Sequence, residues 1–505
     1  MERSPKIITA ALFVSVLLGV LDTAFVVPTL TAIIREWSVS YQWGIWTITL
    51  YLFMFVMSMP VTRLLAHYVG RQFMLTVSLL LFGAGAVISG FSPTFSALLA
   101  GRLLQGIGGG GLLTLTAVVL SKGGITRRYG LVSVPLATGA ILAFMLGSLL
   151  VTVLHWRWIF YIQFPLAFLL CVLILCKPGK PAKGRKAFDG VGLILFAGIA
   201  LCLMVGFTLI QPEQFGVSVF SANVFPFIVV ALGLIIPFIM VERQHDVPLI
   251  PLRYFYRQNL VLAWMSSIFS GMSWIALIFI PAFAENTLRL KPGAGGYMLA
   301  IFAVAAVVSV AITSLTTERY GAAVTGTTGF VLAACGFLLL GTLVSQFWGF
   351  VLAVILLGLG LGATIRVPFN PFTVTHYFRM VGMTTGSAVL VTFLTQATGK
   401  IPERVRDSLV ATSPSAKEVS GGIFADLVEG SSQFMVPNAE KLREFIPDHI
   451  AVSTQELILR QIMRVMRETL MEGYQNLFVA AAVFTLIGLM CAMAIVRMER
   501  DEGEA

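Results

Sequence analysis

The chain has 505 residues, of which 57% are hydrophobic and only 11% are charged. Because an ordinary soluble domain carries roughly 25% charged residues, this composition excludes a soluble fold that covers its apolar surface with charges. The net charge of +10 does not indicate nucleic-acid binding, since the Lys and Arg residues lie mostly in short loops between apolar runs, as membrane topology requires.

Apolar runs recur along the chain at about the 20 residues that a helix needs to cross a hydrocarbon layer. They show no period-two alternation, so helices are predicted in place of a β-barrel. In chain order the predicted spans lie near 7–30, 43–62, 73–92, 97–120, 130–154, 158–176, 190–211, 222–241, 260–283, 294–316, 323–345, 347–370, 376–398 and 475–497. The sequence therefore predicts an all-α membrane protein with about 14 transmembrane helices.

The spacing of the spans predicts a modular organisation. Residues 1–176 form an N-terminal six-helix bundle, 177–189 a basic cytoplasmic loop, 190–242 two inserted helices, 243–259 a cytoplasmic connector, and 260–505 a C-terminal six-helix bundle. A long polar outer loop occupies about 400–473, with a helical stretch from about Thr454 to Glu472. The placement of Lys and Arg predicts a multi-pass protein of the inner, cytoplasmic membrane with both termini in the cytoplasm.

One acidic residue, Asp22, interrupts the first predicted span. A carboxylate inside a membrane helix is costly, and burial favours its neutral form, so such a residue can load and release protons. Two readings stay open for Asp22: a proton-coupling residue, or a polar contact between packed helices.

The fourth predicted span carries Arg102, Gln105, Gly106 and Gly108, in the pattern Arg-x-x-Gln-Gly-x-Gly. A buried arginine needs a counter-charge or carbonyl partners, and glycines let helix backbones approach closely. Arg102 and Gln105 are therefore candidates for a polar substrate or charge site, with a purely structural ion pair as the alternative.

These motifs resemble the fourteen-span drug:proton antiporter family of the major facilitator superfamily. The resemblance rests on Leu21 to Pro28 in the first span, Arg102 to Gly108 in the fourth, Trp156 to Pro165, and Pro248 to Phe255 before the second bundle. It implies two six-helix bundles with two helices inserted between them, alternating access to a substrate bound near the midplane, and a possible periplasmic adaptor protein as partner.

Two segments depart from the family pattern. The loop after the second span keeps Gly70 and Arg71, but His67 stands where the family has the gating Asp, so the usual charge lock at this conformational-gate loop is in doubt. In the fifth span Gly139 and Gly147 remain as helix-packing positions, whereas the Gly-Pro pair between them is missing.

The second bundle contributes Arg366, His376 and Arg379 near its cytoplasmic end, and Glu285 at the end of a span. We interpret the three cations as topology-setting or snorkelling residues, with a ligand role as the alternative. Because the ionisable residues at membrane depth are mainly cationic, we hypothesise that the substrate is neutral or anionic and amphipathic.

The sequence therefore predicts a secondary active transporter for proton-coupled export of amphipathic small molecules such as drugs, detergents, fatty acids or siderophores. The alternatives are an importer or uniporter without proton antiport, and a non-transporting membrane receptor or assembly factor. No catalytic cluster, metal-ligand cluster or phosphate-binding Gly-Lys-Ser/Thr loop is found, so we expect no enzyme activity, no metal and no cofactor, with the proton gradient as the energy source.

Overall fold

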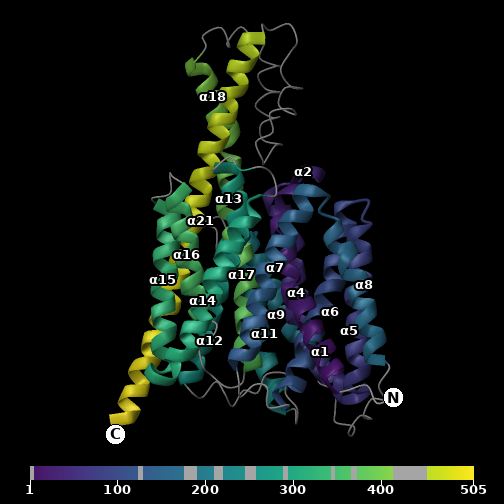
Figure 1. Cartoon of the computed structure of the whole chain (residues 1–505). Coiled ribbons are helices and arrows are strands. Elements are labelled where there is room, and N and C mark those ends of the chain that lie inside the picture. Colours follow the sequence, from purple (N-terminus) through teal and green to yellow (C-terminus); the bar gives the residue numbers. More distant parts are fainter. Residues whose placement is uncertain are drawn as a thin grey trace.

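A computed structural model describes residues 5–122, 129–175, 190–209, 220–244, 258–287, 290, 294–342, 347–364, 372–412 and 452–504. These residues are helical apart from short connections, and the helices run side by side as long rods with both chain termini at one end of the molecule (Figure 1). The predicted all-α fold is confirmed. The basic segment 177–189 and most of the connector 243–259 lie outside the described residues.

The first six rods form the N-bundle. They comprise α1 (Pro5–Val26), η1 (Val27–Thr29), α2 (Leu30–Trp37), α3 (Tyr41–Gly44), α4 (Trp46–Val69), α5 (Arg71–Gly90), α6 (Phe95–Lys122), α7 (Tyr129–Val153) and α8 (Trp158–Leu175). α6 packs along both α4 and α5, and α1 packs on α6, α7 and α8.

The last six rods form the C-bundle. They comprise α12 (Gln258–Ile275), η5 (Ala276–Ile278), α13 (Phe279–Thr287), α14 (Gly296–Tyr320), α15 (Ala322–Thr342), α16 (Phe347–Thr364), α17 (Phe372–Gly399) and α21 (Val452–Glu504). Between the two bundles in sequence, α9 (Gly190–Thr208) and α11 (Phe225–Gln244) pack against each other, and α9 also contacts α17.

The two bundles repeat the same local irregularities at corresponding places. The first rod of each bundle is interrupted by a 3-10 turn, η1 in the N-bundle and η5 in the C-bundle. The second and third rods of each bundle are joined through a glycine in the left-handed half of backbone space, Gly70 at φ 92° and Gly321 at φ 79°. Such matched features are what an internal structural repeat produces, and positive φ is accessible mainly to glycine.

The glycines of α6 lie on two faces of the helix, one that packs against α4 and one that packs against α5. A Cβ added at Gly106 or Gly110 would meet the backbone of α4, whereas one at Gly108 would meet the backbone of α5 at Ser78 and Phe82. Because backbone atoms cannot rotate away, these positions hold three helices at close range. Gly139 and Gly147 of α7 likewise face α1 and its end, at Leu21 and Phe25.

A helical hairpin projects beyond the rods on the side opposite the termini, which we call the hairpin side (Figure 1). It consists of α18 (Ile401–Thr412) and the first half of α21. Val405 on α18 and Ile462 and Met466 on α21 are fully buried, and Arg404 pairs with Glu472 at 2.6 Å. The predicted helix near Thr454–Glu472 is confirmed as part of α21. The sequence did not predict α18 within the long polar segment; its buried Ile401, Val405 and Leu409 recur every four residues and face α21.

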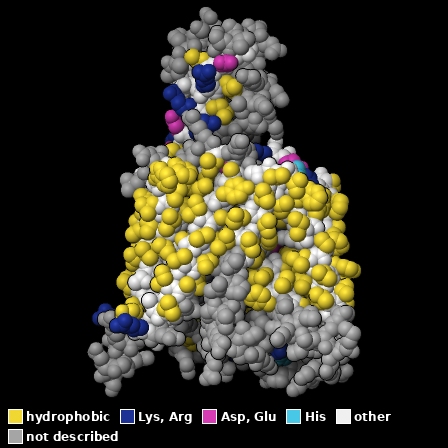
Figure 2. Space-filling view, in the orientation of Figure 1, with side chains coloured by type: hydrophobic (Ala, Val, Ile, Leu, Met, Phe, Trp, Pro, Cys, Tyr) yellow, Lys and Arg dark blue, Asp and Glu magenta, His cyan; other side chains and the backbone are white. Residues whose placement is uncertain are grey.

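Hydrophobic side chains cover the body of the molecule on the face seen in Figure 2, whereas Lys, Arg, Asp and Glu lie on the hairpin and at the two ends of the body. Twelve helices of the described residues are long and apolar enough to cross a membrane. Two more, Ile141–Val153 and Gly190–Gly206, are apolar but shorter over their described stretches. These helices occupy the positions of the predicted spans, and the apolar surface is the one that lipid requires.

Candidate functional site

A buried ion pair lies in the middle of the N-bundle. Asp22 on α1 and Arg102 on α6 are both fully inaccessible to solvent, and Arg102 Nη2 lies 2.6 Å from Asp22 Oδ2. Fixing these two charges in an apolar interior carries a desolvation penalty that is offset only if the remaining polar atoms also find partners.

Two glutamines supply those partners and close a ring. Arg102 Nη1 donates to Gln105 Oε1 at 2.8 Å, Gln105 Nε2 donates to Gln163 Oε1 at 2.8 Å, and Gln163 Nε2 donates to Asp22 Oδ1 at 2.8 Å. Since a guanidinium only donates and a carboxylate only accepts, both amides must point their carbonyls toward Arg102 and their N–H groups toward Asp22. We call these four residues the polar ring.

Arg102 also has partners that are independent of Asp22. Its Nε donates to the backbone oxygen of Thr47 on α4 at 2.9 Å, and its guanidinium carbon lies 4.3 Å from the centre of the Tyr51 ring. The Tyr51 hydroxyl donates to the carbonyl of Gly19 on α1 at 2.5 Å, which fixes the ring in place. A carbonyl, an amide and an aromatic face therefore remain around Arg102 if the charge of Asp22 is removed.

The structure brings together three of the residues predicted from the sequence. Asp22, Arg102 and Gln105 meet in the polar ring, but Arg102 does not stand free as a substrate-binding charge, because Asp22 neutralises it. The gate-loop residues His67 and Arg71 lie elsewhere, exposed at the α4–α5 junction beside Gly70, and no ion pair of theirs occurs within the described residues.

Gln163 is the residue that sequence reasoning missed. In the sequence, Gln163 lies within the segment Trp156 to Pro165, which contributed only to the family resemblance. The available signal was that Gln163 is an isolated amide inside an apolar span, which must find a partner when buried. Trp156 in the same segment is buried and hydrogen-bonds Glu36, and Arg157 pairs with Glu36 at 2.6 Å, so part of that segment closes the hairpin side of the N-bundle.

The two bundles contact each other on the hairpin side through polar groups. Tyr41 on α3 and Tyr474 on α21 have hydroxyl oxygens 3.0 Å apart, and Asn286 Nδ2 of α13 donates to both, at 3.1 and 3.2 Å. All three side chains are buried. We call these residues the outer gate. Nearby, Arg35 of α2 approaches Glu285 of α13 to 4.0 Å.

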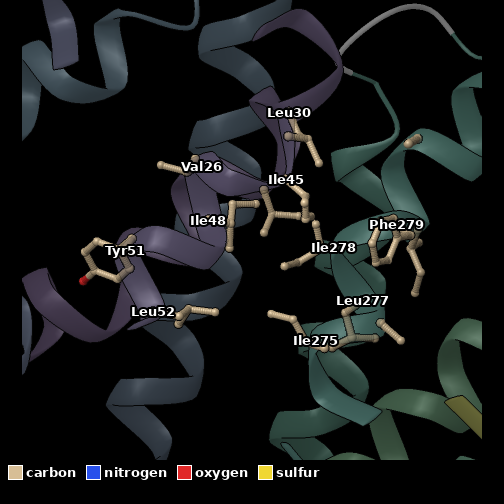
Figure 3. Close-up of a cluster of buried hydrophobic side chains, with 14 of the residues drawn as sticks. Val26, Leu30, Ile45, Ile48, Tyr51, Leu52, Ile275, Leu277, Ile278 and Phe279 are labelled. Carbon is tan, nitrogen blue, oxygen red and sulfur yellow. The ribbon is translucent and has the colours of Figure 1, made fainter. Parts of the chain in front are cut away.

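Apolar side chains continue this seal toward the middle of the molecule. Ile45, Ile48 and Leu52 of the N-bundle face Ile275, Leu277 and Ile278 of the C-bundle (Figure 3). All six side chains are buried in one continuous core. On the same stretch of α4, between Ile48 and Leu52, Thr49 Oγ1 lies 2.8 Å from Ser387 Oγ of α17. The bundles are therefore in contact on the hairpin side in this conformation.

Arg379 occupies the C-bundle without an acidic partner among the described residues. It is only 8% exposed, which contradicts snorkelling, one of the two roles expected from the sequence. Its Nη2 donates to Thr364 at the end of α16, and its backbone oxygen lies against Gly271 of α12. Arg366 lies outside the described residues, as does the side chain of His376.

A helical membrane protein built as two pseudo-repeated bundles with a buried charge pair is a secondary-transporter architecture. The sequence profile of the Major Facilitator Superfamily matches residues 12–399. The chain belongs to this superfamily and is a multi-pass integral membrane protein with a transporter fold.

Individual relatives agree with this assignment. The chain is 24% identical to an uncharacterised MFS-type transporter of Bacillus subtilis, YfiU, over 99% of this chain and 98% of the relative. It is 22% identical to the multidrug transporter protein MdtP of Bacillus subtilis over 88% of this chain and 84% of that protein. Among solved structures, a bacterial homologue of the human lysosomal transporter Spinster in an inward-facing, unoccupied conformation superposes with a TM-score of 0.59 at 15% identity, covering 98% of this chain and 99% of that one.

Proposed function

We propose that this protein exports amphipathic small molecules in exchange for protons, and that Asp22 carries the proton. The observation behind the proposal is the arrangement around Arg102, which keeps three partners when Asp22 is neutral. Multidrug names among the relatives support the class of substrate. The termini are proposed to lie in the cytoplasm; the adaptor partner stays a prediction from the sequence.

Protonation of Asp22 would change which contacts stabilise the N-bundle. The charged carboxylate holds α1 to α6 through Arg102 and to α8 through Gln163. A neutral carboxyl weakens both contacts, so α1 can shift relative to α6 and α8. A proton and a substrate that bias the two conformations in opposite directions are thermodynamically linked, with typical coupling free energies of about 1–3 kcal/mol.

A second function, transport without proton exchange, is favoured by a different feature of the same site. Each member of the polar ring is paired and buried, so the ring could serve as a permanent structural tie between α1, α6 and α8. In that case Asp22 stays charged throughout the cycle, and transport follows the substrate gradient alone.

Transport by Asp22→Asn in proteoliposomes distinguishes the two functions. One assay measures export driven by a proton gradient. The other measures exchange against unlabelled substrate on one side, without a proton gradient. Under proton coupling, we expect gradient-driven export to fall at least about tenfold while substrate exchange stays within about threefold of the wild type, because exchange requires no net proton movement. The control is Asp407→Asn, a surface carboxylate of the hairpin with a 68% exposed side chain. Wild-type export that is indifferent to the proton gradient would rule the coupling out.

A further inference from the structure

The buried Arg379 side chain makes a single hydrogen bond among the described residues. Its Nη2 donates to the backbone oxygen of Thr364, at the end of α16, at 2.7 Å. Its Nε is buried and has no hydrogen-bond partner within the described part of the chain. Thr364 is contacted in turn from α12: Ser270 Oγ lies 3.3 Å and Trp274 Nε1 lies 3.4 Å from Thr364 Oγ1.

Arg102 and Arg379 are both buried, but they differ in the number and kind of their partners. Arg102 has a carboxylate at 2.6 Å, an amide, a carbonyl and an aromatic ring. Arg379 has one carbonyl and no carboxylate within salt-bridge distance among the described residues. Because a buried charge without a counter-charge costs several kcal/mol, the protein sustains a permanent penalty at this position that a hydrophobic residue would avoid.

Arg379 lies on a helix of the C-bundle that also contacts the N-bundle. α17 is the C-bundle helix that contacts α4 of the N-bundle, through Ser387 and Thr49, and it also contacts the inserted helix α9. Arg379 lies two helical turns from Ser387. When the bundles move relative to each other, the surroundings of α17 change more than those of a helix buried within one bundle.

Building on the proposed export of amphipathic molecules, we propose that Arg379 is the binding site for the carboxylate of an anionic amphipathic substrate. Thr364 of α16 and Trp274 of α12 complete the site. A guanidinium matches a carboxylate through two parallel hydrogen bonds, and its Nε is one of the donors that such a pair uses. Trp274, whose indole N–H lies against Thr364, provides an aromatic surface that the apolar part of the ligand would contact.

The test measures equilibrium binding of tritiated deoxycholate and of its uncharged methyl ester to the purified protein in lipid nanodiscs, with empty nanodiscs subtracted. We expect the wild type to bind deoxycholate at least about tenfold more tightly than the ester. Arg379→Gln is expected to lose that preference while its affinity for the ester stays unchanged. Arg319→Gln, an exposed arginine at the end of α14, is the matched control and keeps the preference.

Arg379→Lys keeps a cation but lacks the planar fork, so it is expected to bind deoxycholate severalfold more weakly than the wild type. It also replaces Arg379→Gln as the test variant if Arg379→Gln aggregates during purification. A wild type without preference for deoxycholate overturns the site, as does a well-folded Arg379→Gln that retains the preference, or an Arg379→Lys with wild-type affinity.

Binding is measured without transport, so the two proposals fail separately. Export that ignores the proton gradient removes the proposed function and leaves a carboxylate site standing. Equal binding of acid and ester removes the site and leaves Asp22-dependent export untouched.

Discussion

At the residue scale, some groups in and around the polar ring can be predicted from the sequence and others cannot. Asp22 and Arg102 could be predicted because charges inside apolar spans must pair. Their mutual contact could not be derived from spacing, since it requires knowing that α1 crosses α6 at this depth. The Thr47 carbonyl is a backbone group without any sequence signature, and Tyr51 resembles any other aromatic residue of an apolar helix.

Gln163→Leu tests whether the ring is a single unit. The substitution leaves Asp22 Oδ1 and Gln105 Nε2 buried without their present partners, and each such loss costs about 1–3 kcal/mol in proteins and less in membranes. We expect a drop of a few degrees in the unfolding temperature of the purified protein, together with reduced proton-driven export. Gln461→Leu in the hairpin is the control, since Gln461 contacts Ser408 outside the rods. Unchanged stability of Gln163→Leu would show that the two glutamines do not support the ion pair.

At the element scale, the packing of α6 depends on the absence of side chains on chosen faces. The glycine-rich sequence of this helix predicted close helix approach, and the structure shows which neighbour each glycine admits. A Cβ at Gly106 would collide with the backbone oxygen of Tyr51, next to the aromatic ring that covers Arg102. The packing and the site are therefore connected, because on α6 Arg102 lies one turn before Gly106 and Gln105 directly precedes it.

Gly106→Ala is accordingly expected to destabilise the protein by about 1–3 kcal/mol, the usual cost of overpacking, and to lower transport. The contrast is Gly349→Ala in α16, where an added Cβ meets nothing within 4 Å. There alanine should be neutral or stabilising by up to about 1 kcal/mol through helix propensity. The measurement is the yield of monodisperse protein after heating; equal yields for the two variants would contradict the packing argument.

The hairpin contains a helix, α18, that the sequence did not predict. The segment after residue 400 is polar, with charged residues such as Glu403, Arg404 and Asp407 in close succession, so hydropathy ends the membrane span there and predicts a loop. The helix persists because its apolar residues face α21, a partner that begins about 50 residues later in the chain. The apolar spacing within the 12 residues of α18 is too short to identify a helix in the sequence when its partner α21 is not known.

At the scale of the whole molecule, the repeated breaks at η1 and η5 place α2 and α13 at equivalent positions of the two bundles. Both follow the first rod of their bundle, and they meet across the molecule through Arg35 and Glu285 beside the outer gate. The resemblance of the sequence to its family predicted two bundles, but not which residues join them. Tyr41, Asn286 and Tyr474 are separated by hundreds of residues, and polar residues at span ends are ordinary.

The outer gate should set the balance between the conformations of the transporter. Asn286→Ala removes the amide that donates to both tyrosines, and two interhelical hydrogen bonds in a membrane protein contribute about 1–2 kcal/mol in total. That free energy corresponds to a shift of about 5- to 30-fold in the ratio of closed to open molecules. Spin labels at Trp43 and Trp348, exposed on the hairpin side of the two bundles, report the separation by pulsed electron resonance in a cysteine-free background.

We expect Asn286→Ala to add or enlarge a population with a longer distance between these labels. Thr342→Ala is the matched control, because its hydroxyl bonds only within its own helix, to the carbonyl of Leu338. If the distance distribution of Asn286→Ala equals that of the wild type, the apolar contacts between Ile45, Ile48 and Ile278 suffice to hold the bundles together. In that case the seal depends on hydrophobic packing, and a polar substitution at Ile278 should open it where Asn286→Ala does not.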